Sequence, residues 1–302
     1  MKILFLFCFT GLIQVLTAQQ IPDTSYHPKI GSPAYTAEGG PFVYIDAAHQ
    51  NFHTRTGRYQ SFARLLEADG YRVVDNNKKF SNASLQGINL LVIANAEPVN
   101  ATEPVVAPTS SAFTDTEIKA VEKWVRGGGS LLLIADHMPF AGAAAQLAAA
   151  FDFTFYDGFA LVKPGDGLFD FKRSDGSLAE VVVTRGRNHT EQITQVRSFT
   201  GQGFRIPPSA ESILNLNDTQ SIYLTDTMWV FNDRVRTIPA SGLSQGALLE
   251  YGAGRVVCYG EAAMFSAQLA GPNRFKAGMN TQEAAQNFQL LLNTIHWLDY
   301  IL

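Results

Sequence analysis

The sequence predicts a mixed α/β fold: a three-layer, flavodoxin-like domain with a mostly parallel sheet and helices on both faces. Two observations carry this prediction. Short, continuous apolar runs recur along the chain, as expected of strands that are covered on both faces. Segments with apolar residues at helical spacing alternate with these runs, which is typical of β-α-β units. The apolar runs are residues 42–45, 90–94, 130–135 and 255–259.

The first residues and the composition indicate an exported protein. Lys2 precedes an apolar run that ends at Ala18. This pattern predicts a signal peptide over residues 1–18 and a periplasmic or secreted bacterial protein; an uncleaved anchor is the alternative. Only Cys258 would remain after cleavage, which excludes an intrachain disulfide. The net charge of −4, without a basic stripe, argues against nucleic acid as a partner. No later apolar run is long enough for stable membrane insertion.

The next elements follow in β-α-β order. Residues 19–40 are rich in Pro and Gly and predict an extended N-terminal arm. Residues 59–69 carry apolar side chains at helical spacing, Gly70 ends this helix, and 71–74 form a second strand. A strand, helix and strand of this length imply a right-handed crossover between parallel strands.

A second unit begins with a capping box. Thr114 and Glu117 have the spacing at which a hydroxyl caps a helix and a carboxylate three residues later reaches back. The helix ends at the glycines 127–129 and leads into the strand at 130–135. The alanine-rich segment 141–151 then predicts a helix that packs closely on the sheet.

The segment from about 153 to 240 differs in character. Its short β-branched runs, among them 181–183, are separated by turn residues and predict antiparallel strands inserted into one domain that spans 41–302. The glycines in 252–254 predict a hairpin. A further capping box at 280–283 predicts the start of the final helix.

Polar side chains follow four of the predicted strands. In open parallel sheets, ligands bind just beyond the carboxyl ends of the strands. Three of the six histidines of the chain fall in this set, more than strand ends ordinarily supply. The sequence therefore predicts a ligand-binding or catalytic site at this edge. Its residues are Asp46, His49, His53, Asn95, Asp136, His137 and Glu261.

The first loop is a candidate metal site. His49 and His53 are four residues apart, so they would share one face of a helix, and Asp46 would complete a three-ligand set. Imidazole and carboxylate suit Zn²⁺ or another divalent metal. The alternative is that Asp46 caps a turn and the histidines bond to backbone. Asn51 and Asn95 are the predicted substrate-binding amides.

Asp136, His137 and Glu261 are the predicted catalytic residues. Adjacent ionisable groups at a strand end suit general acid and base catalysis. Each carboxylate also has a structural alternative. Asp136 can cap the alanine-rich helix, and Glu261 can be a first-turn carboxylate favoured by the helix dipole.

Several segments resemble a known family. The phrases are "YIDAAHQNFHTRTGRYQSFARLLEADGYRV", "LLVIANA", "FTDTEIKAVEKWVRGGGSLLLIADHMPFAGAAAQLAAAF" and "GRVVCYGEAAMFSAQ". They resemble an uncharacterised family of bacterial exported proteins, itself similar to the class I glutamine amidotransferase superfamily with its flavodoxin-like sheet. The similarity spans about 42–156 and 245–300. Glutaminases of that superfamily carry a nucleophilic cysteine at a strand-to-helix turn. The equivalent turn here is Ala135-Asp136-His137, so the resemblance does not imply glutamine amide transfer.

Together these features predict an exported hydrolase, with or without a metal, acting on a small-molecule or carbohydrate substrate. The alternative is a non-catalytic module that binds a carbohydrate or a partner, and a purely structural exported protein is a third. In the binding module, aromatic side chains of the insert would form a platform: Tyr156, Phe159, Phe169, Phe171 and Trp229.

Overall fold

The computed structural model describes residues 20–101 and 103–302, so the predicted signal peptide lies outside the described residues. Its central sheet has the strand order β3-β2-β4-β5-β15-β14-β10-β6, with β11 paired to β14. The first five strands are parallel: β3 (Arg72–Asn76), β2 (Phe42–Asp46), β4 (Leu90–Ala94), β5 (Ser130–Ile134) and β15 (Gly254–Tyr259). The predicted mixed α/β fold with a largely parallel central sheet is confirmed.

The parallel strands, numbered along the chain, have the order 2-1-3-4-5, which is one of the two common orders of doubly wound sheets. The antiparallel strands extend the sheet beyond β15. They are β14 (Ser244–Tyr251), β10 (Phe204–Arg205), β6 (Thr154–Phe155) and β11 (Glu211–Asn215). The predicted hairpin at 252–254 is confirmed, because Tyr251 of β14 pairs with Gly254 of β15.

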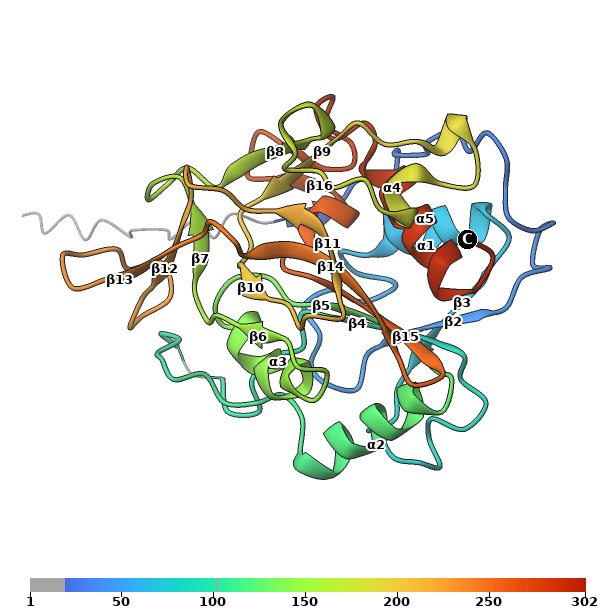
Figure 1. The fold of residues 1–302 in the computed structure, drawn as a ribbon, viewed down its shortest axis with the longest axis horizontal. Helices are drawn as coiled ribbons and strands as arrows, with labels where there is room; N and C mark the ends of the chain where they lie inside the picture. Colours follow the sequence, from blue (N-terminus) through green and yellow to red (C-terminus); the bar gives the residue numbers. More distant parts are fainter. Residues whose placement is uncertain (1–19, 102) are drawn as a thin grey trace, which may run out of the picture.

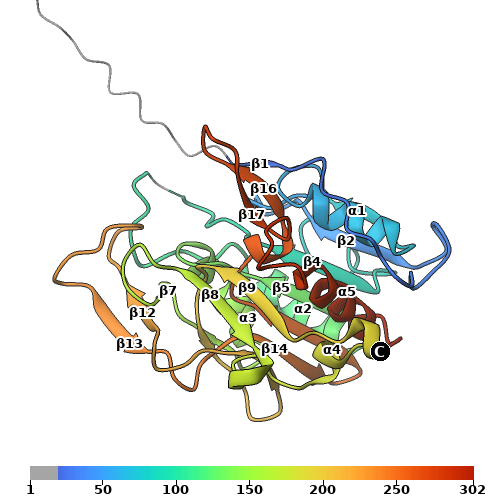
Figure 2. The same cartoon turned by 90° about the horizontal axis from the view of Figure 1, so that it is seen from above.

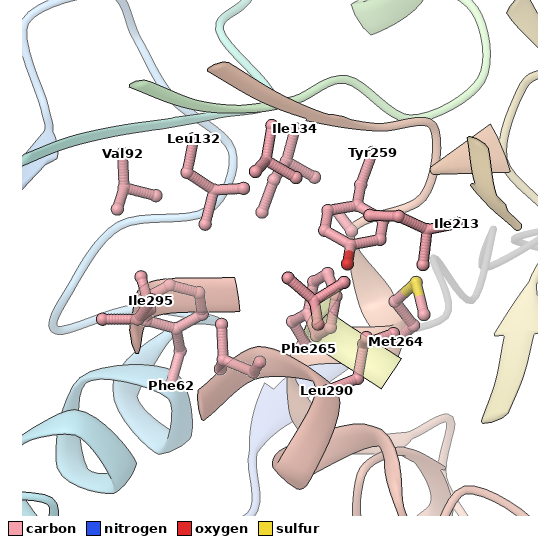
Figure 3. Close-up of a cluster of buried hydrophobic side chains, with 14 of the residues drawn as sticks. Phe62, Val92, Leu132, Ile134, Ile213, Tyr259, Met264, Phe265, Leu290 and Ile295 are labelled. Atoms are coloured by element: carbon pink, nitrogen blue, oxygen red, sulfur yellow. The ribbon is translucent and has the colours of Figure 1, made fainter. Parts of the chain in front are cut away.

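Helices cover the two faces of this sheet (Figure 1). Successive side chains of a strand point to opposite faces, so each central strand contributes to two separate cores. Val92 and Leu132 belong to the core that contains α1 (Gln60–Ala68) and α5 (Asn287–Leu298), part of which Figure 3 shows. The second core is formed by the alternate strand residues, with α2 (Asp115–Arg126) and α3 (Phe140–Ala149).

Two predicted helix starts have different outcomes. The capping box of α2 is confirmed: the Thr114 hydroxyl accepts from the Glu117 N–H, and the Glu117 carboxylate accepts from the Thr114 N–H. The predicted capping box at 280–283 is wrong, because α5 begins at Asn287. There the Gln286 side-chain oxygen accepts from the N–H groups of Thr194 and Gln195. Contacts to a distant segment therefore accompany the observed start of this helix.

The segment 154–239 contains mainly short strands. β7 (Phe159–Leu161), β12 (Ser221–Leu224) and β13 (Arg236–Pro239) form one sheet, which lies away from α5 in Figure 2. β8 (Leu168–Lys172) pairs with β9 (Gln195–Phe199). The predicted strand at 181–183 is wrong, because Val182–Arg185 is the short helix α4. The Thr184 hydroxyl accepts from the Val181 N–H and so starts a helical turn in a β-branched run. Short 3-10 helices are η1 (Arg173–Asp175) and η2 (His189–Glu191).

The N-terminal arm and the segment after β15 meet in a small sheet. β1 (Gln20–Pro22), β16 (Ala267–Ala270) and β17 (Phe275–Gly278) pair in the order β1-β16-β17. The short 3-10 helix η3 (Ala263–Phe265) links β15 to this sheet. No helix within the described residues is long and apolar enough to cross a membrane.

Candidate functional site

A cavity of about 500 Å³ lies beyond the carboxyl ends of β2, β4, β5 and β15. The loop after each of these strands contributes at least one polar side chain to its wall, and the segment 199–229 contributes Phe199, Met228 and Trp229. The cavity is therefore at the predicted edge of the sheet. The ionisable and amide side chains in its wall include His53, Arg58, Asn95, Asp136, His137 and Glu261.

Asn95, directly after β4, holds two of these residues in place. Its side-chain oxygen lies 2.9 Å from the backbone nitrogen of Asp136, and its side-chain nitrogen lies 3.2 Å from Nδ1 of His53. A backbone N–H can only donate, so the amide oxygen must face Asp136 and the amide NH₂ must donate to His53. Nδ1 of His53 is therefore an acceptor, and the neutral ring carries its proton on Nε2.

His53 is deeply buried, with 3% of its surface exposed. Its ring centroid lies 4.6 Å from that of Tyr59 and 5.5 Å from that of Phe52. Burial and the nearby Arg58 cation lower the pKa of His53 to about 3, so the ring is neutral at pH 7. Nε2 has no hydrogen-bond partner among the described residues. His53 thus lines the cavity and carries a buried N–H donor without a partner among the described residues.

Asp136 and Glu261 are neighbouring carboxyl groups in the same cavity. Glu261 is 1% exposed, and its two oxygens accept from the N–H groups of Ala263 and Met264 at 2.8 and 2.6 Å. Burial, and next the charge of Asp136, raise the pKa of Glu261 well above its usual range. Asp136 is 8% exposed, and its Oδ1 accepts from the His137 N–H at 2.7 Å. Glu261 is not in the first turn of η3, but it precedes this helix and accepts from two of its N–H groups, whereas Asp136 does not cap α3.

His137 has the opposite tautomer from His53. Its Nδ1 lies 2.6 Å from the carbonyl oxygen of Met138, which can only accept, so Nδ1 carries a proton. In the neutral ring, Nε2 then holds the free lone pair, 3.9 Å from Oδ1 of Asp136. The ring packs against Phe159 and Trp229, with centroid distances of 4.7 and 4.6 Å.

His49 does not line this cavity and lies against the second core. Its Nδ1 is 2.7 Å from Asp46 and its Nε2 is 3.0 Å from Glu117, so both ring nitrogens contact carboxylates. Phe80 and Phe113 of the second core pack against the ring. Glu117 therefore both caps α2 and binds His49, a role that its sequence position does not indicate.

The three predicted metal ligands are not gathered at one point. Residues 47–54 form bends and irregular backbone rather than a helix, so the spacing of His49 and His53 does not place them on one helical face. Neither Asp46 nor His49 lines the cavity. The described residues contain no group of three His, Cys, Asp or Glu side chains that could hold a metal ion. A divalent metal at Asp46, His49 and His53 stays a prediction.

The two predicted substrate-binding amides have different positions. Asn95 lines the cavity. Asn51 is absent from its wall: its NH₂ donates to the Ala94 carbonyl at 3.2 Å and its oxygen accepts from the His49 N–H at 3.2 Å. Both ends of Asn51 are thus bonded to backbone, and the side chain ties the first loop to the end of β4.

Of the five aromatic residues predicted to form a platform, Trp229 is the one in the described wall of this cavity. Phe159 and Phe171 are fully buried, and Tyr156 lines a separate cavity beside α3. Trp229 is the exception, because it lines the cavity with 51% of its surface exposed. Its φ of 63° lies in the left-handed region, which costs a bulky residue free energy. Such backbone strain clusters at functional sites.

Arg58 is the cavity residue that the sequence does not reveal. It follows the first loop as a single cation, without a motif or a spacing that marks it. Its guanidinium lies over the Phe52 ring, 3.6 Å from the centroid, and this contact fixes it beside the cavity. A cation in a cavity of this kind is apparent only from the folded chain.

Comparisons with known proteins bear on the fold. No family model matches the chain, and no curated protein matches it. Among solved structures, the mmIFT52 N-terminal domain is similar, with a TM-score of 0.59 and 14% identity, covering 85% of this chain and 97% of that one. At this identity the likeness shows the fold alone.

Two weaker likenesses are to a ThuA-like protein and to a GMP synthase subunit. A putative ThuA-like protein from Bacteroides uniformis has a TM-score of 0.43 and 12% identity, covering 90% of this chain and 94% of that one. A putative GMP synthase subunit from Thermoplasma acidophilum has a TM-score of 0.41 and 10% identity, covering 84% and 92%. Likenesses of this strength do not bear on activity.

Proposed function

We propose that this protein is an exported hydrolase of a small-molecule or carbohydrate substrate, built on a flavodoxin-like, amidotransferase-like frame. The observation that carries the proposal is the carboxyl pair in the cavity at the sheet edge. Asp136 and the fully buried Glu261 are close enough for the charge of one to raise the pKa of the other. Pairs of carboxyl groups whose environments differ in this way serve as an acid and a base in hydrolases.

The roles follow from the surroundings of each group. Glu261, with its raised pKa, keeps a proton and acts as the general acid. Asp136 acts as the general base, and its Oδ2 is not engaged by the His137 N–H, which binds Oδ1. Asp136 takes a proton from water as the water oxygen bonds to the substrate carbon. The bond from that carbon to the leaving group breaks, and the leaving group receives the proton of Glu261. His137 lies beside Asp136 and orients it through this backbone bond.

Glutamine amide transfer is not part of the proposal. The turn after β5 carries Asp136 and His137 where an amidotransferase would carry its cysteine. Cys258 is fully buried within β15, and burial raises the pKa of its thiol far above the usual range. A buried thiol of this kind is a poor nucleophile.

A binding module is the second candidate, and Trp229 favours it. The exposed indole at the cavity wall packs against His137 and Phe159, and an aromatic face of this kind can stack on a sugar ring. In this alternative, Asp136 and Glu261 would bind hydroxyl groups rather than transfer protons.

The test is a hydrolysis screen of the chain without residues 1–18, using chromogenic glycosides, esters and amides. Asp136→Asn and Glu261→Gln are each expected to lower kcat/KM by roughly 100-fold or more, the usual contribution of a general acid or base. The matched controls are Asp218→Asn and Glu250→Gln, both exposed and outside the cavity wall. Activity that survives both cavity substitutions would refute the catalytic assignment. Sugar binding without turnover of any substrate would favour the binding module.

A further inference from the structure

Arg58 is a cation in the cavity wall that makes no ion pair within the described residues. It lines the cavity, lies over the Phe52 ring and donates from Nη1 to the Phe52 carbonyl at 3.4 Å. Its Nε is buried and has no hydrogen-bond partner in the described part of the chain. Burial lowers the pKa of Arg58, opposed by the charge of Glu97, yet an arginine stays protonated in proteins. The cavity therefore holds a positive charge with unused donors.

The second donor beside it is Nε2–H of His53. Asn95 fixes this proton on Nε2, and the ring is 3% exposed. Both residues line the same cavity, and they are near enough for the charge of Arg58 to act on the imidazole. An unpaired buried N–H costs free energy unless a ligand supplies an acceptor. Each of these two cavity-lining side chains thus has one N–H group without an acceptor among the described residues: Nε of Arg58 and Nε2 of His53.

We infer that the cavity binds a substrate through a carboxylate group, held by the guanidinium of Arg58 and by Nε2–H of His53. The inference rests on the proposed function in one respect, that this cavity is the substrate site. It adds the chemical class of the substrate: a small acidic molecule, such as a uronic acid sugar or a hydroxy acid, rather than a neutral one.

The charges in the cavity favour a carboxylate over a phosphate. Arg58 is the one lysine or arginine in the described cavity wall, and Asp136 and Glu261 share that wall. A carboxylate would add one negative charge to this cavity, whereas a phosphate dianion would add two beside the same two carboxyl groups and the single guanidinium. The planar fork of arginine also fits the planar carboxylate.

The same geometry disfavours a metal ion at His53. A metal binds the lone pair of an imidazole nitrogen, and here Nδ1 accepts from Asn95 while Nε2 carries the proton. The nearby Arg58 cation adds repulsion. His53 is thus a hydrogen-bond donor to an anion in this arrangement.

The experiment is ligand-observed NMR with a fragment library of small carboxylates, each paired with its carboxamide. Carboxylates are expected to bind and their carboxamides are not. Arg58→Met should weaken the bound carboxylates roughly tenfold or more, as expected for a lost charge-assisted hydrogen bond. The matched control is Arg205→Met, because Arg205 is exposed and lies outside the cavity wall. Absence of bound carboxylates, equal binding of carboxamides, or unchanged affinity in Arg58→Met would each overturn the inference.

A second measurement reads the His53 tautomer directly. Long-range ¹H–¹⁵N spectra should show His53, identified by its loss in His53→Phe, protonated on Nε2 alone at pH 7. A proton on Nδ1 would overturn the donor role even if Arg58→Met fails to fold.

The experiments can refute the hydrolase proposal and the carboxylate-binding proposal independently of each other. Asp136→Asn should lower kcat/KM by roughly 100-fold or more while carboxylate binding persists, whereas Arg58→Met should weaken carboxylate binding roughly tenfold or more. If carboxylates bind in an Arg58-dependent way but nothing is hydrolysed, the subsite stands and the catalytic proposal fails. If neutral substrates are hydrolysed as fast as acidic ones, the catalytic proposal stands and the subsite fails.

Discussion

The side-chain amide of Asn95 donates to Nδ1 of His53 across 3.2 Å, and this bond decides which nitrogen of the histidine carries the proton. The orientation of the amide is itself fixed, because its oxygen accepts from the Asp136 N–H. Asn95 has a φ of 46°, in the left-handed region that asparagine tolerates better than most residues. The side-chain amide of Asn95 thus fixes the tautomer of His53 and also binds the backbone of Asp136, which carries one of the two cavity carboxyl groups.

Asn95→Asp should reverse the tautomer of His53. The carboxylate keeps the acceptor for the Asp136 N–H but presents a second acceptor to Nδ1, which must then be protonated. We expect the ¹⁵N spectrum to show the His53 proton on Nδ1. We also expect loss of carboxylate binding, since the new carboxylate at position 95 would add to Asp136 and repel an anionic ligand. Asn273→Asp, in an exposed turn, is the control. An unchanged tautomer would show that Asn95 does not set it.

Hydrolysis should decline as pH rises through the raised pKa of Glu261. The general acid must be protonated, and burial together with the Asp136 charge raises this pKa. The basic limb of such a profile would belong to the interacting pair of Glu261 and Asp136 rather than to one residue. A pH profile of kcat/KM in the active protein, compared with the residual activity of Glu261→Gln, measures this. Persistence of the same basic limb in Glu261→Gln would exclude Glu261 as the acid.

The Glu261 carboxyl group also makes the free energy of unfolding depend on pH. Its folded pKa lies above the usual 4.5, so the native state binds the proton more tightly than the unfolded chain. The resulting stabilisation is fully present below pH 4.5 and is lost as pH rises through the folded pKa. Urea unfolding across this pH range should show that the free energy of unfolding declines less with rising pH in Glu261→Gln than in the unsubstituted protein. Glutamine supplies one acceptor for two N–H groups, so its absolute stability should also be lower by about 1–3 kcal/mol.

Glu117 should contribute stability at neutral pH that is lost in acid. Burial opposes its charge, but bonds from Thr114 and His49 outweigh burial and lower the pKa of Glu117 to about 2. Because the folded value is below the usual 4.5, this contribution is present above pH 4.5 and disappears as pH falls to about 2. Glu117→Gln should lower the free energy of unfolding by about 1–3 kcal/mol at pH 7 and by less at pH 3. Glu67→Gln, on the exposed side of α1, should change neither value.

Two substitutions at Trp229 separate its ring from its backbone. Both Trp229→Ala and Trp229→Gly remove the exposed indole, so both should weaken sugar binding equally. Because φ is 63°, glycine relieves a backbone strain that alanine retains. We expect the glycine variant to be more stable than the alanine variant by about 1 kcal/mol. Thermal unfolding measures the difference, and equal stabilities would show that this backbone is unstrained.

Chelation tests the predicted metal. The proposed acid and base need no ligand set at Asp46, His49 and His53, which the structure does not bring together. After dialysis against a chelator, kcat/KM should remain within about twofold of its value before dialysis. This change is far smaller than the loss expected on removing a catalytic group. Elemental analysis before and after dialysis is the accompanying measurement. Loss of activity together with one equivalent of zinc, restored by zinc alone, would support the metal instead.

The sequence by itself determined the features that depend on neighbouring residues. The continuous apolar strands, the capping box of Thr114 and Glu117, and the hairpin at 252–254 depend on local sequence and geometry. The sheet edge that holds the cavity also followed from sequence, because parallel strands bring their carboxyl ends together whatever the loops do. His53, Asn95, Asp136, His137 and Glu261 were placed there on that ground.

The tertiary structure decided what each of these side chains does. His49 and His53 are four residues apart, yet one contacts Glu117 across 68 positions and the other contacts Asn95 across 42. The tautomer of His53, the raised pKa of Glu261 and the position of Arg58 depend on groups from distant segments. Hydrogen-bond direction and burial are set by whichever neighbours the fold supplies, and a loop without regular periodicity leaves those neighbours unspecified. Contacts to a distant segment also accompany the start of α5. This helix begins after Gln286, whose side-chain oxygen accepts from the N–H groups of residues 194–195, and not at the capping pattern in its own sequence.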